Sequence, residues 1–460
     1  MSTSPLIGQL ESTRDYYKTG HSRPYSFRYQ QLKKLRSSIL KHEKDLHEAL
    51  YSDLKKNAEE SWVTETGFLL SEINAALKNL RQWMQPEKVG TNLVNFPSSS
   101  YILREPLGVV LIIGPWNYPL QLLFTPLVGA IMAGNCVVLK SSEFAPATSA
   151  IMKKIIEENF PEKYILYVEG DGAQVVPAMM NNFRFDHVFY TGSTTVGKII
   201  YKMAAEQLVP VTLELGGKSP CVVESDANIK VAARRIAMTK FSNAGQMCVA
   251  PDYVLVHKSI QEPFVKALKE TLVHFFSQDP STDYSYCKII NEKQFNRLIT
   301  YLNNGTIVHG GRHDAATLYI EPTIMENILP GTPIMKDEIF GPILPVISFE
   351  RFEEAKSIID QNPNPLAFYV YTSSNKKERQ WLQEVPAGGT CVNNSSWHLT
   401  NHYLPFGGRG NSGMGQYHGK NSFETFSHRK AVMKTPTWFD PNIKYPPFKG
   451  KLWLFKKVVN

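Results

Sequence analysis

Hydrophobic and polar positions follow one rhythm in the first 85 residues and another rhythm beyond them. In the first part, apolar residues recur every three or four positions, as in "RYQQLKKLRSSILKHEKDLHEALYSDL", which is typical of amphipathic helices. From Gly108 onward, short apolar runs alternate with helical segments, and the first four runs are "VVLII", "CVVLK", "YILYVEG" and "HVFYTGS". Strands separated by helices in this way predict a parallel, doubly wound sheet.

A second alternating series follows the first one along the chain. Its apolar runs are "VTLELGG", "PCVVES", "DYVLVH", "ILPVISF" and "AFYVYTS", and a helix is expected over residues 229–242. Two such units in series predict an α/β fold with two doubly wound domains and a cleft between them.

The stretch from Pro106 to Leu139 carries no charged residue and is long enough to raise the question of a membrane span. Glycine and proline argue against one continuous helix, because Gly114, Pro115, Pro119 and Pro126 interrupt it. The pattern instead predicts a buried strand over 108–113, a turn over 114–117 and an apolar helix that ends near Gly134.

Asn117 would then lie at the carboxyl end of a strand, which is where open α/β sheets bind their ligands. An asparagine in this position also caps turns without any other function, so both interpretations stay open on this evidence alone.

Composition places the chain among ordinary globular proteins of two or three domains, since 43% of its 460 residues are hydrophobic and 20% are charged. The N-terminus lacks the basic start and apolar run of a secretory signal, which predicts a cytoplasmic protein. No CxxC pair or His-rich segment accompanies the cysteines, so we expect free thiols and no metal site. The five cysteines are Cys136, Cys221, Cys248, Cys287 and Cys391.

The net charge of +8 is concentrated at the C-terminus. From Arg429 onward there are eight Lys or Arg residues and one acid, Asp440, so seven of the eight excess charges lie in the last 32 residues. The rest of the chain is nearly neutral, which argues against a nucleic-acid-binding protein.

The segment "FYTGSTTVGKII" is the candidate nucleotide site. A strand is expected to end at Tyr190, and Gly192 to Gly197 then open a helix whose N–H groups and dipole suit an anion such as pyrophosphate. Two glycines are not the three-glycine dinucleotide fingerprint, and a plain turn fits as well. Lys140 and Glu143, at the end of the strand "CVVLK", add a cation and a carboxylate that a ribose could meet.

Cys248, in "NAGQMCVAPDY", is the candidate nucleophile because it is expected in a loop between a helix and a strand. Glu214, in "LELGGKSP", ends an apolar strand just before two glycines, and burial would raise its pKa toward that of a general base. The alternatives are a structural thiol and a buried glutamate paired with a lysine.

The ordered set "PWNYP", "KSSE", "YTGSTTVG", "ELGGKSP", "NAGQMCVAPDY", "DEIFGP" and "LPFGGRGNSGMGQYHGKNSFETFSH" resembles the aldehyde dehydrogenase superfamily. The short N-terminus and the last motif are most similar to its class 3 branch, which includes fatty and aromatic aldehyde dehydrogenases. The resemblance covers about residues 40–430. It implies NAD(P)-dependent oxidation of an aliphatic or aromatic aldehyde to the carboxylic acid through a cysteine thioester.

The resemblance also implies roles for single residues. Cys248 matches the catalytic thiol, Glu214 the hydrolytic base and Asn117 the donor to the oxyanion. Glu214 argues against a CoA-acylating enzyme, which needs no such base. NAD is the expected cofactor and NADP a second one, bound by residues that match the family's cofactor site: Lys140, Glu143, Thr191, Gly192, Ser193, Gly197, Leu215, Glu338 and Phe340.

By the same resemblance, residues 1–85 and 106–210 would form the NAD-binding domain and residues 211–395 the catalytic domain. Residues 86–105 and 396–430 would form a small β arm through which two copies make a homodimer. The tail, 431–460, combines lysines with aromatic residues. It either packs on the protein or its dimer partner, or it contacts an anionic membrane surface.

Two other classes of function remain open from the sequence. One is a protein that has the aldehyde dehydrogenase fold without its activity, although Cys248, Glu214 and Asn117 are all retained. The other is a thiol redox sensor, which would require a second cysteine such as Cys391 near Cys248.

Overall fold

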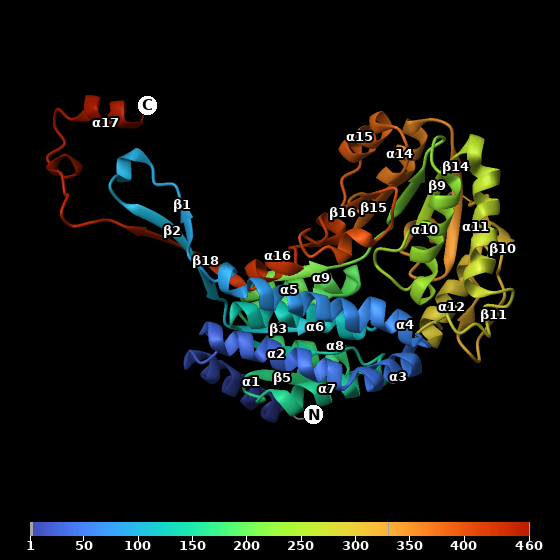
Figure 1. The fold of residues 1–460 in the computed structure, drawn as a ribbon, viewed down its shortest axis with the longest axis horizontal. Helices are drawn as coiled ribbons and strands as arrows, with labels where there is room; N and C mark the ends of the chain where they lie inside the picture. The colour runs from blue at the N-terminus through green and yellow to red at the C-terminus, as the bar shows by residue number, and fades with distance from the viewer. Residues whose placement is uncertain (1–2, 330, 460) are drawn as a thin grey trace.

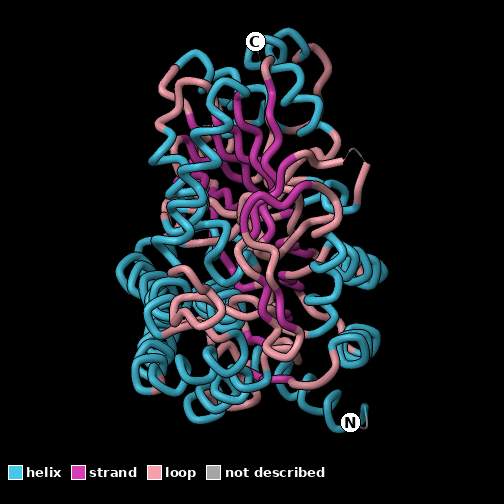
Figure 2. Tube along the Cα trace, turned by 90° about the vertical axis from the view of Figure 1, so that its right-hand side faces the viewer, coloured by secondary structure: helices cyan, strands magenta, loops and turns pink. Residues whose placement is uncertain are grey.

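The computed structural model of the chain describes residues 3–329 and 331–459. Figure 1 shows two lobes beside one another and an arm that carries the C-terminal segment away from the first lobe. In the described residues, the first lobe contains a six-stranded sheet and the second lobe a seven-stranded sheet. The arm contains a three-stranded sheet. The strands of the lobes lie inside a shell of helices (Figure 2). The α/β fold predicted from the sequence, with two wound sheets and a β arm, is confirmed.

The first sheet has the order β17-β7-β6-β3-β4-β5, and its neighbours are parallel except for β17 and β7. Its apolar runs are buried because helices cover both faces of a parallel sheet. The carboxyl ends of the parallel strands therefore meet at one edge. The strands are β3 (Val109–Ile113), β4 (Cys136–Lys140), β5 (Ile165–Val168), β6 (His187–Thr191), β7 (Val211–Glu214) and β17 (Gly413–Met414).

Helix α6 (Pro119–Ala133) explains the uncharged stretch of the sequence. It is buried along its whole length, packs against α2, α5 and the first sheet, and ends at Gly134, whose φ of +91° suits glycine. Among the described residues, no helix combines the length and the apolar character needed to cross a membrane. The predicted strand, turn and buried helix are therefore confirmed for this region.

The N-terminal helices cover the first sheet, as their amphipathic pattern predicts. They are α1 (Thr3–Lys18), α2 (Tyr25–Lys41), α3 (Glu43–Leu54), α4 (Ala58–Ser61), the π-helix η1 (Trp62–Thr66) and α5 (Gly67–Trp83). The crossover helices of the sheet are α7 (Pro146–Asn159), α8 (Gly172–Asn182) and α9 (Thr194–Glu206).

The second sheet has the order β10-β13-β14-β9-β8-β15-β16 and is parallel except for β10 with β13. Four of the five runs predicted for the second series form its centre, namely β8 (Pro220–Val223), β9 (Tyr253–His257), β14 (Ile343–Phe349) and β15 (Ala367–Tyr371). The remaining run, "VTLELGG", forms β7 and pairs with β6 in the first sheet, so its assignment to the second series was wrong. The sequence did not predict its remaining strands: β10 (Thr306–His309), β13 (Thr323–Glu326) and β16 (Gly389–Val392). The helices of this lobe are α10 (Ile229–Phe241), α11 (Gln261–Phe276), α12 (Glu292–Tyr301), α13 (Pro333–Lys336), α14 (Phe352–Asp360) and α15 (Asn375–Glu384).

The arm consists of β1 (Glu87–Val89), β2 (Ser99–Pro106) and β18 (Ser427–Lys434), in that order. β18 pairs with β2 along its full length, from Ser427 opposite Pro106 to Lys434 opposite Ser99. Segment 396–430 was expected in the arm, but the structure distributes it between the first lobe and the arm. β17 joins the first sheet and α16 (Gly419–Thr425) packs on α5 and α6, while only the start of β18 enters the arm. The other domain bounds stay a prediction.

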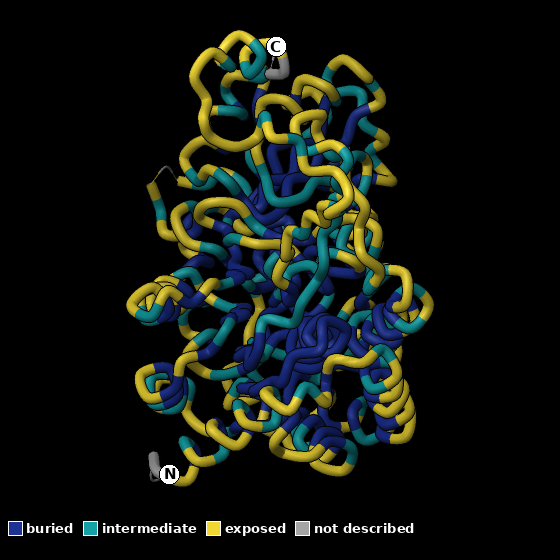
Figure 3. The backbone as a smooth tube through the Cα atoms, turned by 90° about the vertical axis from the view of Figure 1, so that its left-hand side faces the viewer, coloured by how far each residue is buried: buried dark blue, intermediate teal, exposed yellow. Residues whose placement is uncertain are grey.

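Beyond β18 the chain continues as an extended tail that ends in the helix α17 (Leu452–Val459). α17 lies beside the 3₁₀ turn η2 (Leu93–Asn95) of the arm. Most of the tail is exposed, whereas burial is concentrated around the two large sheets (Figure 3).

Candidate active site

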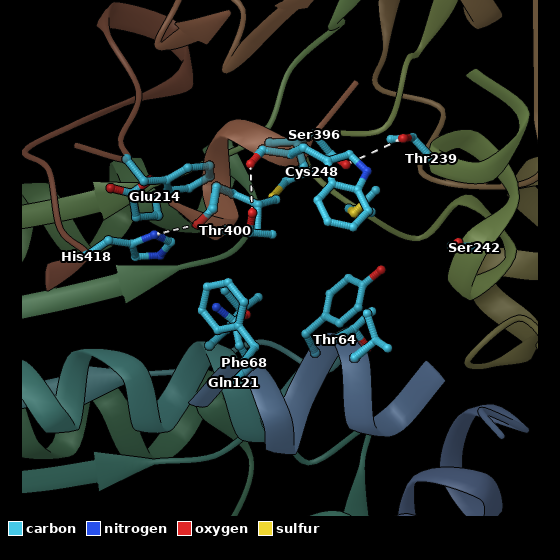
Figure 4. A pocket seen from close by; sticks show the side chains of 18 of the residues that line it. Thr64, Phe68, Gln121, Glu214, Thr239, Ser242, Cys248, Ser396, Thr400 and His418 are labelled. Carbon is cyan, nitrogen blue, oxygen red and sulfur yellow. Dashed lines mark hydrogen bonds between the residues drawn. The ribbon is translucent and has the colours of Figure 1, made fainter. Parts of the chain in front are cut away.

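A cavity of about 380 Å³ is lined by residues of both lobes. Figure 4 shows Thr64, Phe68 and Gln121 on the helices of one wall, opposite Cys248, Ser396 and Thr400. Most of the lining is apolar, and its largest members include Trp62, Phe68, Leu122, Met238, Met247 and Trp397.

Cys248 lies in this cavity, in the loop that follows α10 and the 3₁₀ turn η3 (Ser242–Gly245). It is half-buried, as is Cys391, while the other three cysteines are buried. Burial raises the pKa of the Cys248 thiol, and the carboxylates of Glu338 and Glu214 raise it further. The thiol is therefore protonated at neutral pH and needs a proton acceptor before it can act as a nucleophile.

The loop before Cys248 has an uncommon backbone. Asn243 and Ala244 both have φ near +49°, a left-handed conformation that costs a non-glycine residue about 1–3 kcal/mol. Two contacts hold it in place. The backbone N–H of Asn243 donates to the Glu60 carboxylate at 2.7 Å. The side-chain amide of Asn243 donates to the carbonyl of Asn117 at 2.9 Å.

Asn117 is buried and reaches the same loop from the end of β3. Its side-chain nitrogen donates to the backbone carbonyl of Gln246 at 3.0 Å, and Gln246 lies two residues before Cys248 in the sequence. Because an amide nitrogen has two hydrogens, one donor remains for another acceptor. Asn117 therefore does more than cap a turn, since it connects the first lobe to the cysteine loop.

Glu214 ends β7 and lies in the same cavity as Cys248. Its side chain is buried, and neither carboxyl oxygen has a hydrogen-bond partner within residues 3–329 and 331–459. Burial raises its pKa well above the ordinary value of 4.5. The alternative of a glutamate paired with a lysine is not seen in that part of the chain. Glu214 is a carboxylate with unused acceptors and enhanced basicity, as a general base requires.

The ends of β4 and β6 place the predicted nucleotide-binding residues along one edge of the first sheet. The buried Lys140 donates to the carbonyl of Ser141 and lies 3.3 Å from the exposed Glu143. Glu143 also accepts from the N–H of Gly172 at 3.1 Å. At the end of β6, the hydroxyl of Thr191 is buried and has no partner among the described side chains and backbone.

The loop from Gly192 to Gly197 turns from β6 into α9. Ser193 caps this helix, because its hydroxyl accepts from the N–H of Val196 at 3.4 Å. A Cβ on Gly197 would lie 2.7 Å from Leu215, so the glycine allows α9 to pack closely on the end of β7. Leu215 thus lies beneath the loop and supports it.

Glu338 and Phe340 face this edge from the second lobe. A Cβ on Gly216 would lie 2.1 Å from the Glu338 carboxylate, so the glycine permits their contact. Burial raises the pKa of Glu338 to about 8. Phe340 has a left-handed φ of +48° and meets Trp116 edge-on, with ring centroids 5.4 Å apart.

A buried ion pair between Lys218 and Asp252 fixes the segment that carries Glu338 and Phe340. Lys218 also donates to the carbonyls of Ile334 and Asp337, at 2.7 and 3.0 Å. Asp252 accepts from the N–H of Ile339 at 2.9 Å. The sequence analysis did not identify this pair, although Lys218 lies within the motif "ELGGKSP".

A second buried pair, Lys56 with Glu65, also escaped the sequence analysis. The two residues are nine positions apart across a helix break at Asn57, so no helical spacing relates them. Gln246 was missed as well, and its side chain ties the cysteine loop to the backbone of Lys288 and Ile290.

Cys391 lies on β16, and the hydrogen-bond partner of its thiol in the described structure is His398, with Sγ 3.3 Å from Nδ1. All five cysteines are free thiols, and the redox-sensor hypothesis stays untested by this contact. No group of three or more His, Cys, Asp or Glu side chains in the described chain is arranged to hold a metal ion.

Comparison with known proteins agrees with the resemblance noted in the motifs. A sequence model of the aldehyde dehydrogenase family matches residues 9–432. The 4,4'-diaponeurosporen-aldehyde dehydrogenase of Staphylococcus aureus is 45% identical over 96% of this chain and 97% of its own length. The mouse dimeric NADP-preferring aldehyde dehydrogenase is 42% identical over 98% and 99%. Proteins designated family 3 members are among the further matches.

A solved structure has the same fold. The structure described as the substrate-bound state of Staphylococcus aureus AldH superposes with a TM-score of 0.97 at 44% identity and covers 99% of both chains.

Proposed function

The chain belongs to the aldehyde dehydrogenase family, and from this premise we propose that it oxidises an uncharged, apolar aldehyde to the carboxylic acid with NAD+ or NADP+. The observation that carries the proposal is that one cavity holds both Cys248 and the carboxylate of Glu214, which has no hydrogen-bond partner among the described residues. Aldehyde oxidation is the activity of the family. The substrate class, the cofactor and the roles of the residues are our proposals.

The edge of the first sheet fits a dinucleotide. The N-terminus of α9, opened by Gly192, suits a pyrophosphate, because the first N–H groups of a helix have no partner within it. Lys140 and Glu143 suit ribose hydroxyls, and Glu338 with Phe340 would hold the nicotinamide end. When bound, NAD+ or NADP+ supplies the acceptor for the hydride.

Cys248 would attack the carbonyl carbon of the aldehyde, and its thiol proton would pass to a neighbouring carboxylate, Glu214 or Glu338. The aldehyde oxygen becomes an alkoxide in this step. The free N–H of the Asn117 amide and the backbone N–H of Cys248 would donate to it. Such donors stabilise the transition state more than the ground state, because they meet a charge that develops only during the reaction.

Loss of hydride from the same carbon leaves a thioester on Cys248, which water must then hydrolyse. Glu214 lines the cavity and its raised pKa favours acceptance of a proton, so it would activate this water. The carboxylic acid leaves, and the thiol of Cys248 is restored.

The cavity supports an apolar substrate, medium- or long-chain aliphatic or aromatic. Its lining contains no Lys or Arg in the part of the chain described here. Its histidine, His418, is neutral because burial lowers its pKa to about 3. An aldehyde that carries a carboxylate or phosphate would lose its hydration without gaining a cation. Apolar side chains at the rim, such as Trp62 and Trp397, would instead cover a long chain or a ring.

We also propose that two copies associate as a homodimer through the arm. Apolar side chains of the arm and tail are exposed in the single chain, including Leu93, Phe96, Met433, Trp438 and Trp453. A relative named as dimeric matches 98% of this chain. The other hypothesis for the tail is contact with an anionic membrane surface through its lysines and aromatic residues.

NADH absorbance tests the proposed function directly. The purified protein is mixed with NAD+, or NADP+ in a parallel series, and with straight-chain, aromatic and carboxylated aldehydes. We expect turnover of the apolar aldehydes and a far higher KM for the carboxylated ones. A complete absence of both NADH and NADPH would favour a non-catalytic or redox-sensing protein, and a preference for the carboxylated aldehydes would overturn the proposed substrate class.

A further inference from the structure

Lys56 and Glu65 form an ion pair in the interior of the first lobe. Both side chains are fully buried, and Lys56 Nζ lies 3.0 Å from Glu65 Oε1. Neither residue lines the cavity. Removal of two charges from water costs several kcal/mol per ion before their attraction offsets it, so the pair is a poor means of stabilising a fold. The pair also contacts the backbone at the start of helix α6.

The second oxygen of Glu65 lies at the start of helix α6. It accepts from the N–H of Gln121 at 2.8 Å. The cap residue of this helix, Tyr118, makes no side-chain capping hydrogen bond. Glu65 therefore performs this function from another helix, because it satisfies a free N–H and places a negative charge at the positive end of the helix dipole.

Lys56 contacts the residues just before the same helix. Its Nζ donates to the backbone carbonyl of Asn117 at 3.3 Å and lies 4.1 Å from the ring centroid of Tyr118. Lys56 and Glu65 thus hold the two ends of segment 117–121. The Asn117 carbonyl is also the acceptor for Asn243, which belongs to the strained loop before Cys248.

The π-helix η1 connects this pair to the cavity. Its residue Glu65 points inward to Lys56, whereas Trp62 and Thr64 of the same turn line the cavity. Single π-helical turns inside α-helices occur frequently at functional sites, because the wider turn redirects side chains. One short element therefore contributes both to the cavity wall and to the support of Asn117.

We propose that Lys56 and Glu65 are positioning residues that set the backbone of Asn117, so that its side-chain amide faces the oxygen of an aldehyde bound to Cys248. This inference rests on the proposed function, in which Asn117 is the oxyanion donor. The pair acts through Asn117 and does not touch the substrate.

A double-mutant cycle tests the proposal. Lys56→Met combined with Glu65→Gln removes both charges together, so that no unpaired charge is left in the interior, and the introduced glutamine keeps an acceptor for the N–H of Gln121. The rate of the first NADH burst is measured in this variant, in Asn117→Ala and in the combination of all three changes. We expect the paired change to slow the burst by about tenfold in the native background, because small displacements of a reacting group are costly. In the Asn117→Ala background it should have no further effect.

Two controls separate positioning from general damage. Alkylation of Cys248 by iodoacetamide needs no oxyanion donor and should proceed at the native rate in the Lys56 and Glu65 variant. Lys218→Met with Asp252→Asn removes the other buried pair at a comparable cost in folding. It should raise the KM for NAD+, and its effect on the burst should persist in the Asn117→Ala background.

Each outcome decides the question. Equal losses with and without Asn117 would overturn the positioning role, as would a parallel loss of thiol alkylation. If the paired variant does not fold, Glu65→Asp alone is used, because it keeps both charges and only withdraws the carboxylate from the N–H of Gln121, and it should show a smaller loss that also disappears in Asn117→Ala. Failure of the proposed function looks different, because the native protein would then form no NADH or Asn117→Ala would be as active as the native protein.

Discussion

The groups that surround Cys248 differ between the side proposed to bind the cofactor and the side proposed to bind the aldehyde. On the cofactor side, strand ends and glycines bring main-chain groups and carboxylates close together, as Gly216 does with Glu338. On the aldehyde side, helices and loops present aromatic and sulfur-containing side chains such as Trp62 and Met247. The lining of the second side is mostly apolar, with hydroxyl groups such as those of Thr239 and Ser242 between the apolar side chains.

This difference suits one side to binding the cofactor and the other to binding the aldehyde. Directional groups suit a cofactor whose ribose and phosphate atoms have fixed positions, whereas an apolar wall accepts chains of varied length. Each side also contributes one carboxyl group with a raised pKa next to the thiol, Glu338 from the cofactor side and Glu214 from the aldehyde side. The comparison predicts that changes on one side leave binding on the other side intact.

Replacement of the thiol between the sides should have the largest effect. Cys248→Ala should abolish NADH formation, because the described lining of the cavity contains no second cysteine to form the thioester, while NAD+ binding measured by calorimetry stays unchanged. Cys391→Ala is the matched control, since this half-buried cysteine lies outside the cavity lining, and it should keep both properties. More than a trace of turnover in Cys248→Ala would contradict the assignment of the nucleophile.

Glu214→Gln should slow steady turnover by about a hundredfold, the usual contribution of a positioned base, and leave the first burst of NADH in place. Burial raises the pKa of Glu214, so its basic form appears only as the pH rises through that higher value. Steady turnover of the native protein should therefore increase with pH over this range, and the variant should lack that increase. Stopped-flow absorbance separates the two phases.

The buried Glu72 offers a control for this experiment. Its pKa is also raised by burial, but it accepts from the N–H of Gly419 and lies outside the cavity lining. Glu72→Gln should keep both phases. An equal loss of burst and steady turnover in Glu214→Gln would mean that Glu214 chiefly takes the proton from Cys248.

A change in the apolar wall should have a smaller and more selective effect. Trp62→Ala should raise the KM for a long-chain or aromatic aldehyde by about tenfold, in line with the loss of one partly buried ring, and leave the KM for NAD+ unchanged. Trp438→Ala removes an exposed tryptophan of the tail and should change neither. An increase in the KM for NAD+ in Trp62→Ala would show that the two sides are not independent.

The sequence predicted more residues of the cofactor side than of the aldehyde side, and the difference has a physical reason. Close approach of backbone and side chain leaves local marks in the sequence, because a Cβ at Gly197 would press against Leu215 and a Cβ at Gly216 would displace the Glu338 carboxylate. The aldehyde side is assembled from distant segments that have no common pattern. Trp62 comes from a π-helix and Trp397 from a 3₁₀ turn, and neither shows in sequence which side chains it meets.

The same reasoning applies to the fold. The buried central strands have continuous apolar runs and were predicted, as were the amphipathic helices of the first lobe. Strand β10 lies at a sheet edge with half of its residues exposed, and β17 has only two residues, so neither forms a recognisable run. The pair Lys56 and Glu65 could not be predicted, because burial of both charges depends on how the loop after α3, the π-helix η1 and the start of α6 meet.

The tail should have the smallest effect on either side of Cys248, because it extends beside the arm (Figure 1) and none of its described residues lines the cavity. Deletion of residues 436–460 should leave turnover of a short aldehyde unchanged. If the tail packs on the arm and its dimer partner, the deletion lowers the melting temperature or shifts the sedimentation coefficient toward that of a monomer. The intact protein then does not co-sediment with anionic vesicles, even at low salt, where lysines bind such surfaces most strongly. Vesicle binding that is lost on deletion, with the oligomeric state unchanged, would instead favour a membrane contact.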